Sequence, residues 1–596
     1  MTAISRAGGP ADSGPKGRGL ADFNADRRLL MLAAMAVAVG SFATFAAWGL
    51  IKLINLTTNL IWFGRLDAAQ ASMAHAARGP WMVAAPVLGG VIIGLMARFG
   101  SEKIRGHGIP EAIEAILIGG SRMSPKVAVL KPISSAISIG SGGPFGAEGP
   151  IIMTGGAIGS LFAQFFHLSA AERKVLLVAG AAAGMTAIFG TPVAAVLLAV
   201  ELLLFEWRPR SFIPVAAAAV MAACWRPSLF GHGPLFPFAA QVGLPWWGLI
   251  ACAGMGLVAG LQSSLLTKAL YTLEDAFERL PIHWMWWPAL GGLAVGFGGL
   301  IEPRALGVGY DVIGDLLGGG LLWRAVMAIL LVKAGIWLVA LSSGTSGGVL
   351  APLLILGGAL GWLVGLVLPG GTGLWALLGM AAMLGGTMRS PLTGAVFALE
   401  LTGDFKLLAP LLAASTAAYA VTVLLLKRSI LTEKIARRGQ HITREYGIDP
   451  YELARVADVM IAEVDALCAD QTVAEALAVF EAGGHRIYPV VDDARRPVGL
   501  VSRADALRWE VAGDGGEERL GDRISDADLP CAHPGDVLAR AVELMIATDA
   551  GRLPVTDPQS GALVGLLTRK SLLRVRANAV RAEADRQAFF GARTAG

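Results

Sequence analysis

The sequence predicts a multi-pass, all-helical membrane domain with broken helices and two related halves, followed by a small α/β domain outside the membrane. Of the 596 residues, 55% are hydrophobic and only 16% are charged, which is too apolar for an ordinary soluble enzyme. Long apolar runs fill the first part of the chain, and their sequence repeats after about 200 positions. Near residue 430 these runs give way to segments of ordinary charge density.

Several apolar runs are long enough to cross a bilayer, which takes about 20 helical residues. They cover residues 29–56, 81–96, 244–265, 321–341 and 407–426. Arg27 and Arg28 precede the first run, and a basic cluster follows the last one. By the positive-inside rule we expect both termini in the cytoplasm and an even number of crossings.

Composition divides the chain into six expected segments. Residues 1–27, rich in Gly, Pro, Ser and charge, favour a disordered cytoplasmic tail over a cleavable signal peptide. The segments that follow are a membrane domain at 28–435, a linker at 436–455, two copies of an α/β module at 456–512 and 521–578, and a C-terminal tail at 579–596. Each module has a short β-hairpin pattern followed by helical residues.

Composition also excludes several classes of function. The net charge is only +4, and no basic stripe with interleaved aromatic residues is present, so we expect no nucleic acid partner. The four cysteines are scattered without a metal-ligand spacing, so we assign neither a metal site nor a redox role. No catalytic residues are assigned, and we expect a protein that is not an enzyme.

The membrane domain repeats itself at two places. Pro150 and Pro352 lie 202 positions apart, and each is followed by a Gly-Gly-Ala-x-Gly run. Pro192 to Glu201 and Pro391 to Glu400 form a second pair, offset by 199 positions. Internal duplication is typical of transporters, whose sites lie where the halves meet. The offsets by themselves leave open whether the halves are inverted.

Three segments interrupt the apolar pattern with glycine and proline, namely 106–110, 146–150 and 347–352. Proline suits the first turn of a helix, and glycine lets the backbone approach a ligand closely. The free amides of a helix start carry a partial positive charge and favour an anion without holding it too tightly. The alternative is that Gly and Pro only kink packed helices. Three such segments together favour the anion site.

Glu148 lies inside one of these segments, where a carboxylate is costly unless it meets amide donors or takes up a proton. Ionised, the side chain would occupy the anion site; protonated, it would swing away and open the path. We therefore predict that Glu148 is a gate and a candidate proton carrier. The alternative is a helix-capping glutamate without a transport role.

These motifs resemble those of the CLC family of chloride channels and proton/chloride antiporters, whose GxGIP, GxEGP and GxxxP signatures match residues 106–110, 146–150 and 348–352. The resemblance covers roughly residues 29–435. It implies inverted halves, a homodimer and one anion path per subunit, with Glu148 as the gate. The anion-binding residues that it implies are His107, Gly108, Ile109, Gly146, Ala147, Gly149, Val349, Leu350 and Ile430.

Three positions depart from the family pattern. His107 stands where the family has Ser or Pro; it could donate a hydrogen bond to the anion and titrate near neutral pH, or it could turn aside. Leu202 follows Glu201 where antiporters carry the internal proton acceptor, which favours a channel or a weakly coupled transporter. No Tyr lies near residues 429–431, and Ile430 takes the place of the tyrosine that closes the inner side of the site.

The C-terminal modules resemble a tandem CBS pair, which is cytoplasmic in this family and often binds an adenine nucleotide. In the first module Ser502 and Asp505 match the family pattern, with Asp505 suited to ribose hydroxyls. In the second module Thr568 remains, but Ser571 replaces the aspartate. The resemblance therefore implies at most one nucleotide site; a purely structural CBS pair is the alternative.

The sequence as a whole predicts a transporter of chloride or a similar small anion, leaning towards a channel or a weakly coupled transporter, in the plasma membrane of a bacterium. The alternatives are a proton-coupled antiporter and a non-conducting, membrane-anchored nucleotide sensor. Expected partners are the anion, protons, the lipid bilayer and a second copy of the chain. No cofactor is required, with an adenine nucleotide as an optional ligand.

Overall fold

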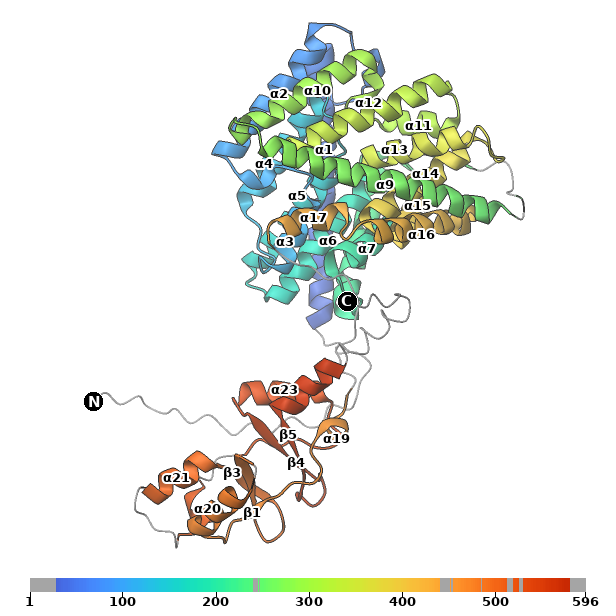
Figure 1. Cartoon of the computed structure of the whole chain (residues 1–596). Helices are drawn as coiled ribbons and strands as arrows, with labels where there is room; N and C mark the ends of the chain where they lie inside the picture. Colours follow the sequence, from blue (N-terminus) through green and yellow to red (C-terminus); the bar gives the residue numbers. More distant parts are fainter. Residues whose placement is uncertain are drawn as a thin grey trace. The chain divides into compact units, whose positions relative to one another are not determined.

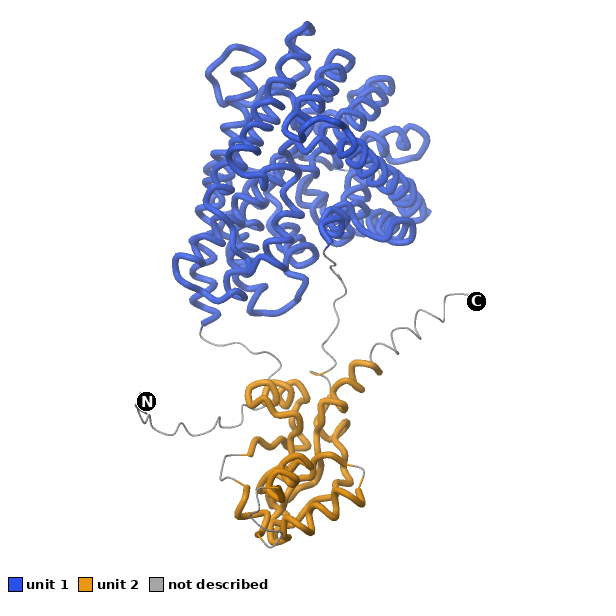
Figure 2. Tube along the Cα trace, turned by 60° about the vertical axis from the view of Figure 1, so that its left-hand side comes forward, with its two compact units in different colours: residues 1–444 blue, residues 445–596 orange. Residues whose placement is uncertain are grey.

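The computed structural model describes residues 28–239, 245, 247–439, 451, 454–483, 485–511, 518–524 and 529–578. The chain forms two compact units, Met1–Arg444 and Glu445–Gly596 (Figures 1 and 2). The predicted tails at 1–27 and 579–596, and most of the predicted linker at 436–455, lie outside the described residues.

The regular elements in the described part of the first unit are all helices. Its α-helices are α1 (Arg28–Thr58), α2 (Pro80–Phe99), α3 (Ile109–Leu117), α4 (Pro125–Gly140), α5 (Glu148–Phe165), α6 (Ala170–Phe189), α7 (Pro192–Leu198), α8 (Pro209–Phe230), α9 (Gly248–Glu278), α10 (Trp287–Ile301), α11 (Tyr310–Gly318), α12 (Trp323–Ser342), α13 (Leu350–Val364), α14 (Thr372–Met388), α15 (Pro391–Thr402), α16 (Leu408–Leu425) and α17 (Ile430–Arg437). A π-helical turn, η4 (Ala199–Leu204), continues α7.

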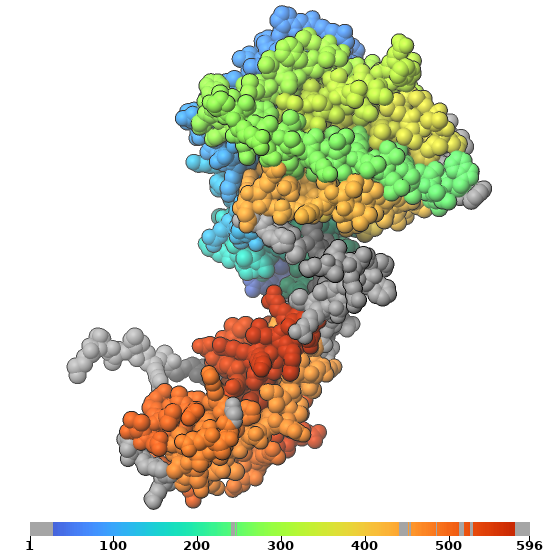
Figure 3. Space-filling model, in the orientation of Figure 1, coloured from blue at the N-terminus to red at the C-terminus, as the bar shows by residue number. Residues whose placement is uncertain are grey.

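Among the described residues, seven helices are long and apolar enough to cross a membrane. Most residues of the five apolar runs predicted from the sequence lie in α1, α2, α9, α12 and α16, so the helical nature of these parts is confirmed. α9 and α16 lie side by side along one face of the unit (Figures 1 and 3). Leu261 and Leu265 of α9 and Leu424 of α16 are exposed. Large apolar side chains on an outer face suit contact with lipid.

The helix pairs of the two halves are packed in the same way. α5 packs on α6, and α13 packs on α14. A methyl group on Gly155 of α5 would lie 2.3 Å from the carbonyl oxygen of Gly180, and one on Gly357 of α13 would lie 2.4 Å from that of Gly379. Small residues allow helix backbones to approach closely in a membrane. The glycines of the repeat therefore set the distance between the paired helices.

Reciprocal contacts relate the halves by a local two-fold axis. Gly146 and Gly348, 202 positions apart, form an antiparallel bridge in which each amide donates to the carbonyl of the other, at 3.1 and 2.8 Å. Two repeat-related segments that pair antiparallel are interchanged by a two-fold rotation. The inverted arrangement that the resemblance implied is therefore confirmed.

The second unit contains two similar modules. The first has a sheet of β1 (Leu467–Cys468), β2 (Ile487–Val491) and β3 (Pro497–Ser502) in that order, and the second pairs β4 (Arg552–Thr556) with β5 (Leu563–Thr568). The helices are α19 (Val456–Val459), α20 (Val473–Ala482), α21 (Arg503–Val511), α22 (Leu520–Arg523) and α23 (Leu538–Ala547), and residues 569–578 are also helical. Ile487 pairs with Ser502 and Arg552 with Thr568, so the predicted hairpins are confirmed.

The close packing of α5 on α6 leaves no room for a side chain at Gly155. Gly155→Ala should lower the unfolding temperature of the purified protein, because its methyl group would lie 2.3 Å from a backbone carbonyl oxygen. Overpacking of this kind costs about 1–3 kcal/mol. The measurement is thermal unfolding in detergent, followed by size-exclusion chromatography.

Gly254→Ala is the matched control, since Gly254 lies inside α9 with nothing within 4 Å of the added methyl group. It should be neutral or slightly stabilising, because Ala favours a helix over Gly. Equal unfolding temperatures for the two variants would contradict the proposed role of Gly155.

Candidate functional site

Three helix starts, those of α3, α5 and α13, meet at the centre of the first unit. The loops before them are joined by backbone hydrogen bonds. The amide of Gly106 donates to Thr345 at 3.1 Å, and the Gly146–Gly348 bridge connects the other two loops. Amides in the first turn of a helix have no acceptor within that helix. The three glycine-rich segments singled out in the sequence are therefore brought together at three helix starts.

Glycine is required where these loops touch. A methyl group on Gly149 would lie 1.9 Å from the carbonyl oxygen of His107, and one on Gly108 would lie 2.8 Å from that of Gly149. Gly108 also has a φ of +89°, which L side chains rarely adopt. The backbones of α3 and α5 thus approach more closely than any other residue would allow.

Glu148 is fully buried at the start of α5, and its carboxylate reaches the start of α13. Its Oε1 atom accepts a hydrogen bond from the amide of Ala351 at 3.0 Å. Methyl groups on Gly146 and Gly348 would lie 1.8 and 2.5 Å from Oε2, so these glycines leave the space that the carboxylate fills. A carboxylate on free helix amides occupies the position that suits a small anion.

The predicted anion-binding residues have different places in this arrangement. Ile109, Gly149 and Leu350 lie in the first turns of α3, α5 and α13, while Ala147 and Val349 are the N-cap residues of α5 and α13. Their amides fit the predicted role.

Two of the predicted anion-binding residues have amides that are engaged within the protein. The amide of Gly108 donates to the carboxylate of Glu111 at 3.0 Å, and the amide of Gly146 donates to Gly348. Both are therefore already used by the protein. At both residues the backbone approaches a neighbouring segment closely.

His107 is 3% exposed, and its Nδ1 atom is buried without a hydrogen-bond partner among the described residues. The ring interacts electrostatically with charged groups of three elements, namely Glu111 of α3, Lys131 of α4 and Lys434 of α17. A buried ring nitrogen that no protein group satisfies retains its capacity for hydrogen bonding.

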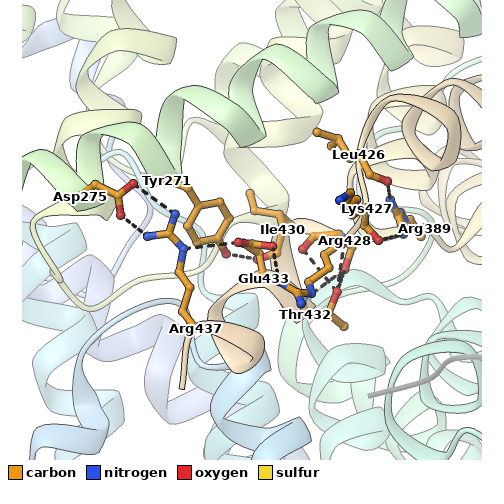
Figure 4. A network of polar contacts seen from close by, with 11 residues as sticks. Tyr271, Asp275, Arg389, Leu426, Lys427, Arg428, Ile430, Thr432, Glu433 and Arg437 are labelled. Atoms are coloured by element: carbon orange, nitrogen blue, oxygen red, sulfur yellow. Dashed lines mark hydrogen bonds and ion pairs between the residues drawn. The ribbon is translucent and has the colours of Figure 1, made fainter. Parts of the chain in front are cut away.

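Ile430 begins α17, and a tyrosine from another helix reaches it. The hydroxyl of Tyr271, on α9, donates to the carbonyl of Ile430 (Figure 4). Arg437 lies 4.7 Å from the centre of the Tyr271 ring and forms an ion pair with Asp275. Sequence reasoning missed Tyr271 because it lies 159 positions before Ile430 and no local pattern connects them.

Leu202 is fully buried in η4, and the glutamate beside it is engaged at a helix start. Oε2 of Glu201 accepts from the amide of Thr393 at 3.0 Å and from its hydroxyl at 2.5 Å. In the other half, Glu400 accepts from the amides of Val193 and Ala194 at 3.0 and 2.8 Å. Each repeated Pro-to-Glu helix thus ends in a carboxylate that caps the start of its counterpart.

A fourth helix start, that of α11, was missed in the sequence. Gly307 and Gly309, both with positive φ, precede Tyr310 as Gly106 and Gly108 precede Ile109, 201 positions earlier. Only the glycine spacing could have revealed it, because Asp311 replaces the proline of the first copy.

A buried lysine secures the loop before each of these two starts. Nζ of Lys131 donates to the carbonyls of Ile104 and Gly106 at 2.8 and 2.7 Å. Nζ of Lys333, 202 positions later, donates to those of Ala305 and Gly307, both at 3.1 Å. Both side chains are fully buried, so each half carries a fixed cation close to a helix start.

A charged cavity of about 670 Å³ opens beside α3 and α17. Gly106 lies in its wall, so the cavity reaches the loop that carries His107. Glu111 pairs there with Lys434 at 2.9 Å and with Arg438 at 3.5 Å. Polar walls of both signs suit a water-filled approach to the buried site.

The predicted nucleotide-binding residues lie where a strand passes into a helix. In the first module, Asp505 accepts from the amide and hydroxyl of Ser502 at 3.2 and 2.5 Å. In the second, Thr568 accepts from the amide of Ser571 at 3.1 Å. These contacts cap the helices that follow, which is the structural alternative weighed above.

Comparisons with known proteins extend this picture. A family model described as voltage gated chloride channel matches residues 89–423, and a CBS domain model matches residues 456–512 and 521–578. The chain is 32% identical to the voltage-gated ClC-type chloride channel ClcB of Escherichia coli O81 (strain ED1a) over 430 residues, which cover 69% of this chain and 100% of that protein.

Two solved structures share the fold. A slow cyanobacterial Cl⁻/H⁺ antiporter aligns with a TM-score of 0.61 and 21% identity, covering 70% of this chain and 99% of its own. A eukaryotic CLC transporter aligns with a TM-score of 0.58 and 18% identity, covering 91% of this chain and 98% of its own.

Proposed function

This chain belongs to the voltage-gated chloride channel (CLC) family, and from that premise we propose that it carries chloride across a membrane along a path gated by Glu148. The observation that carries the proposal is the fully buried carboxylate of Glu148 on the amide of Ala351, where three helix starts meet. The amides of Ile109, Gly149, Val349 and Leu350 are the proposed chloride ligands.

The gate works by competition between two anions. The ionised carboxylate of Glu148 occupies the helix amides and blocks the path. A proton removes its charge and weakens its hold on the amide of Ala351, since a hydrogen bond to an ionised acceptor is roughly twice as strong as one to a neutral acceptor. Chloride then takes the vacated position, and loss of the proton closes the path again.

Weak coupling to protons, or none, is the second part of the proposal. Leu202 is fully buried and cannot carry a proton, while Glu201 beside it is engaged with Thr393. An antiporter would need another inner proton route. His107 is the candidate, because its Nδ1 atom has no hydrogen-bond partner among the described residues and the charged cavity reaches its loop.

Membrane type and assembly complete the proposal. The protein is a multi-pass membrane protein, and the basic residues that flank the membrane domain favour cytoplasmic termini in a bacterial plasma membrane. We propose a homodimer with one path in each subunit.

The test of transport is a flux assay in liposomes that contain the full-length protein and a chloride gradient, with chloride and proton movements recorded together. We expect chloride efflux with little or no proton movement. Absence of chloride flux at every pH would overturn the transport proposal and favour a nucleotide sensor. Uphill proton pumping at a fixed stoichiometry would establish the antiporter.

Glu148→Gln should give a chloride flux that no longer depends on external pH, because the amide imitates the protonated gate. In the wild type, one titrating carboxyl changes the open fraction by at most about tenfold per pH unit. If pH dependence persists in the variant, the titrating group lies elsewhere, and the response of His107→Ser would then identify or exclude His107.

We also propose that the CBS pair binds one adenine nucleotide, with Ser502, Asp505 and Thr568 as ligands. Asp505→Ala should abolish binding of ATP to the full-length protein, measured by isothermal titration calorimetry, because the ribose hydroxyls lose their acceptor. It should also cost about 1 kcal/mol of stability, because Asp505 is part of a helix cap.

Asp493→Ala, which changes an exposed aspartate of the same module, is the control and should bind like the wild type. If Asp505→Ala binds ATP as tightly as this control, Asp505 serves only as a helix cap.

A further inference from the structure

Two buried oxygen atoms near the gate have no hydrogen-bond partner among the described residues. One is Oε2 of Glu148, and the other is the hydroxyl of Tyr310 at the start of α11. Buried polar atoms are rarely left unpaired, because the desolvated group loses its bonds to water. One of these atoms belongs to the side chain that is proposed to move, so the pair points to a contact made in the other state of the gate.

The Tyr310 ring is held in place on two sides. Its centre lies 6.2 Å from that of Phe189 at the end of α6 and 6.0 Å from that of Phe236, both in edge-on contacts. Asp311, the next residue, accepts a hydrogen bond from Ser72 and anchors the loop. The aromatic packing fixes the ring and leaves its hydroxyl free to bind.

The charges near the gate are few. The charge of Glu148 interacts electrostatically with Tyr310 and with Lys333 of α12. Asp311 of α11 also interacts electrostatically with Lys333. The Lys333 ammonium already donates to the carbonyls of Ala305 and Gly307. Tyr310 is therefore the side chain in this group with an unused hydrogen-bonding hydroxyl, and it is neutral, so it suits a protonated carboxyl better than a cation would.

The inverted repeat shows which residue of the first half corresponds to Tyr310. It occupies the position of Ile109 in the first half, 201 residues earlier, at a helix start with the same glycine spacing and the same lysine clamp. Ile109 offers only its backbone amide to the site. The second half has replaced that isoleucine by a side chain that carries a hydroxyl.

We propose that Tyr310 receives Glu148 when the gate opens. The protonated carboxyl leaves the amide of Ala351 and forms a hydrogen bond with the Tyr310 hydroxyl, so Tyr310 is a positioning residue for the open gate. This inference rests on the proposed gating of chloride by Glu148. It adds a defined place for the displaced side chain, supplied by α11.

Removal of that hydroxyl should make the gate harder to open. In Tyr310→Phe the protonated, displaced form of Glu148 loses a hydrogen bond while the ionised, seated form loses nothing. The pH of half-maximal chloride flux should therefore shift to lower values. At a pH where the wild type is partly open, we expect the flux to fall by about three- to tenfold.

The test is a double-mutant cycle in liposomes that contain the full-length protein. Chloride flux is recorded against pH for the wild type, Tyr310→Phe, Glu148→Ala and the double variant. Tyr310→Phe should shift the profile when Glu148 is present and have no effect when it is replaced. Tyr419→Phe, which removes a hydroxyl from α16, is the control and should behave like the wild type.

The outcomes separate this inference from the function on which it rests. Absence of flux in the wild type defeats the proposed function. Flux with an unchanged pH profile in Tyr310→Phe overturns only the inference, and so does an effect that persists in the Glu148→Ala background, because Tyr310 would then act on the anion or the fold.

Infrared spectroscopy supplies a readout that does not need flux. The carbonyl stretch of protonated Glu148, identified by its absence in Glu148→Gln, should shift in Tyr310→Phe at acidic pH. An unchanged stretching frequency would contradict the hydrogen bond.

Discussion

The hydrogen bond between the Glu148 carboxylate and the Ala351 amide joins the two halves at the point where their helix starts meet. A buried negative charge is costly unless hydrogen-bond donors of the protein replace the water that it has lost. The first-turn amides of α5 and α13 meet that need only if the backbones approach without side chains, which Gly146, Gly149 and Gly348 permit. Much of the surrounding helix packing serves to hold these starts in place.

The inverted repeat supplies that support in pairs. Lys131 and Lys333 secure the loops before α3 and α11, and Glu201 and Glu400 cap each other's helices. The two-fold arrangement repeats the same lysine contact and the same glutamate cap in both halves, with opposite orientation, around a single buried site. The halves differ at Ile109 and Tyr310, which begin the corresponding helices α3 and α11.

Three positions of the membrane domain depart from the family pattern that the resemblance implied. His107, Leu202 and Ile430 replace polar or hydroxyl-bearing residues that the resemblance implied, and Tyr271 contacts the start of α17 from another helix. The tyrosine hydroxyl is engaged with a carbonyl, so it stabilises α17 and is not a free anion ligand. The chain thus keeps the glycine-rich helix starts of the family pattern while it changes these three side chains.

The sequence by itself determined the membrane domain, its duplication, the three glycine-rich helix starts and Glu148, because hydropathy, glycine and proline act locally along the chain. Only the tertiary structure decided which amides remain free. The amide of Gly146 is used by Gly348, and the hydroxyl of Tyr271 on α9 donates to the carbonyl of Ile430 at the start of α17. Such pairings depend on the approach of segments up to about two hundred residues apart, which no local pattern encodes.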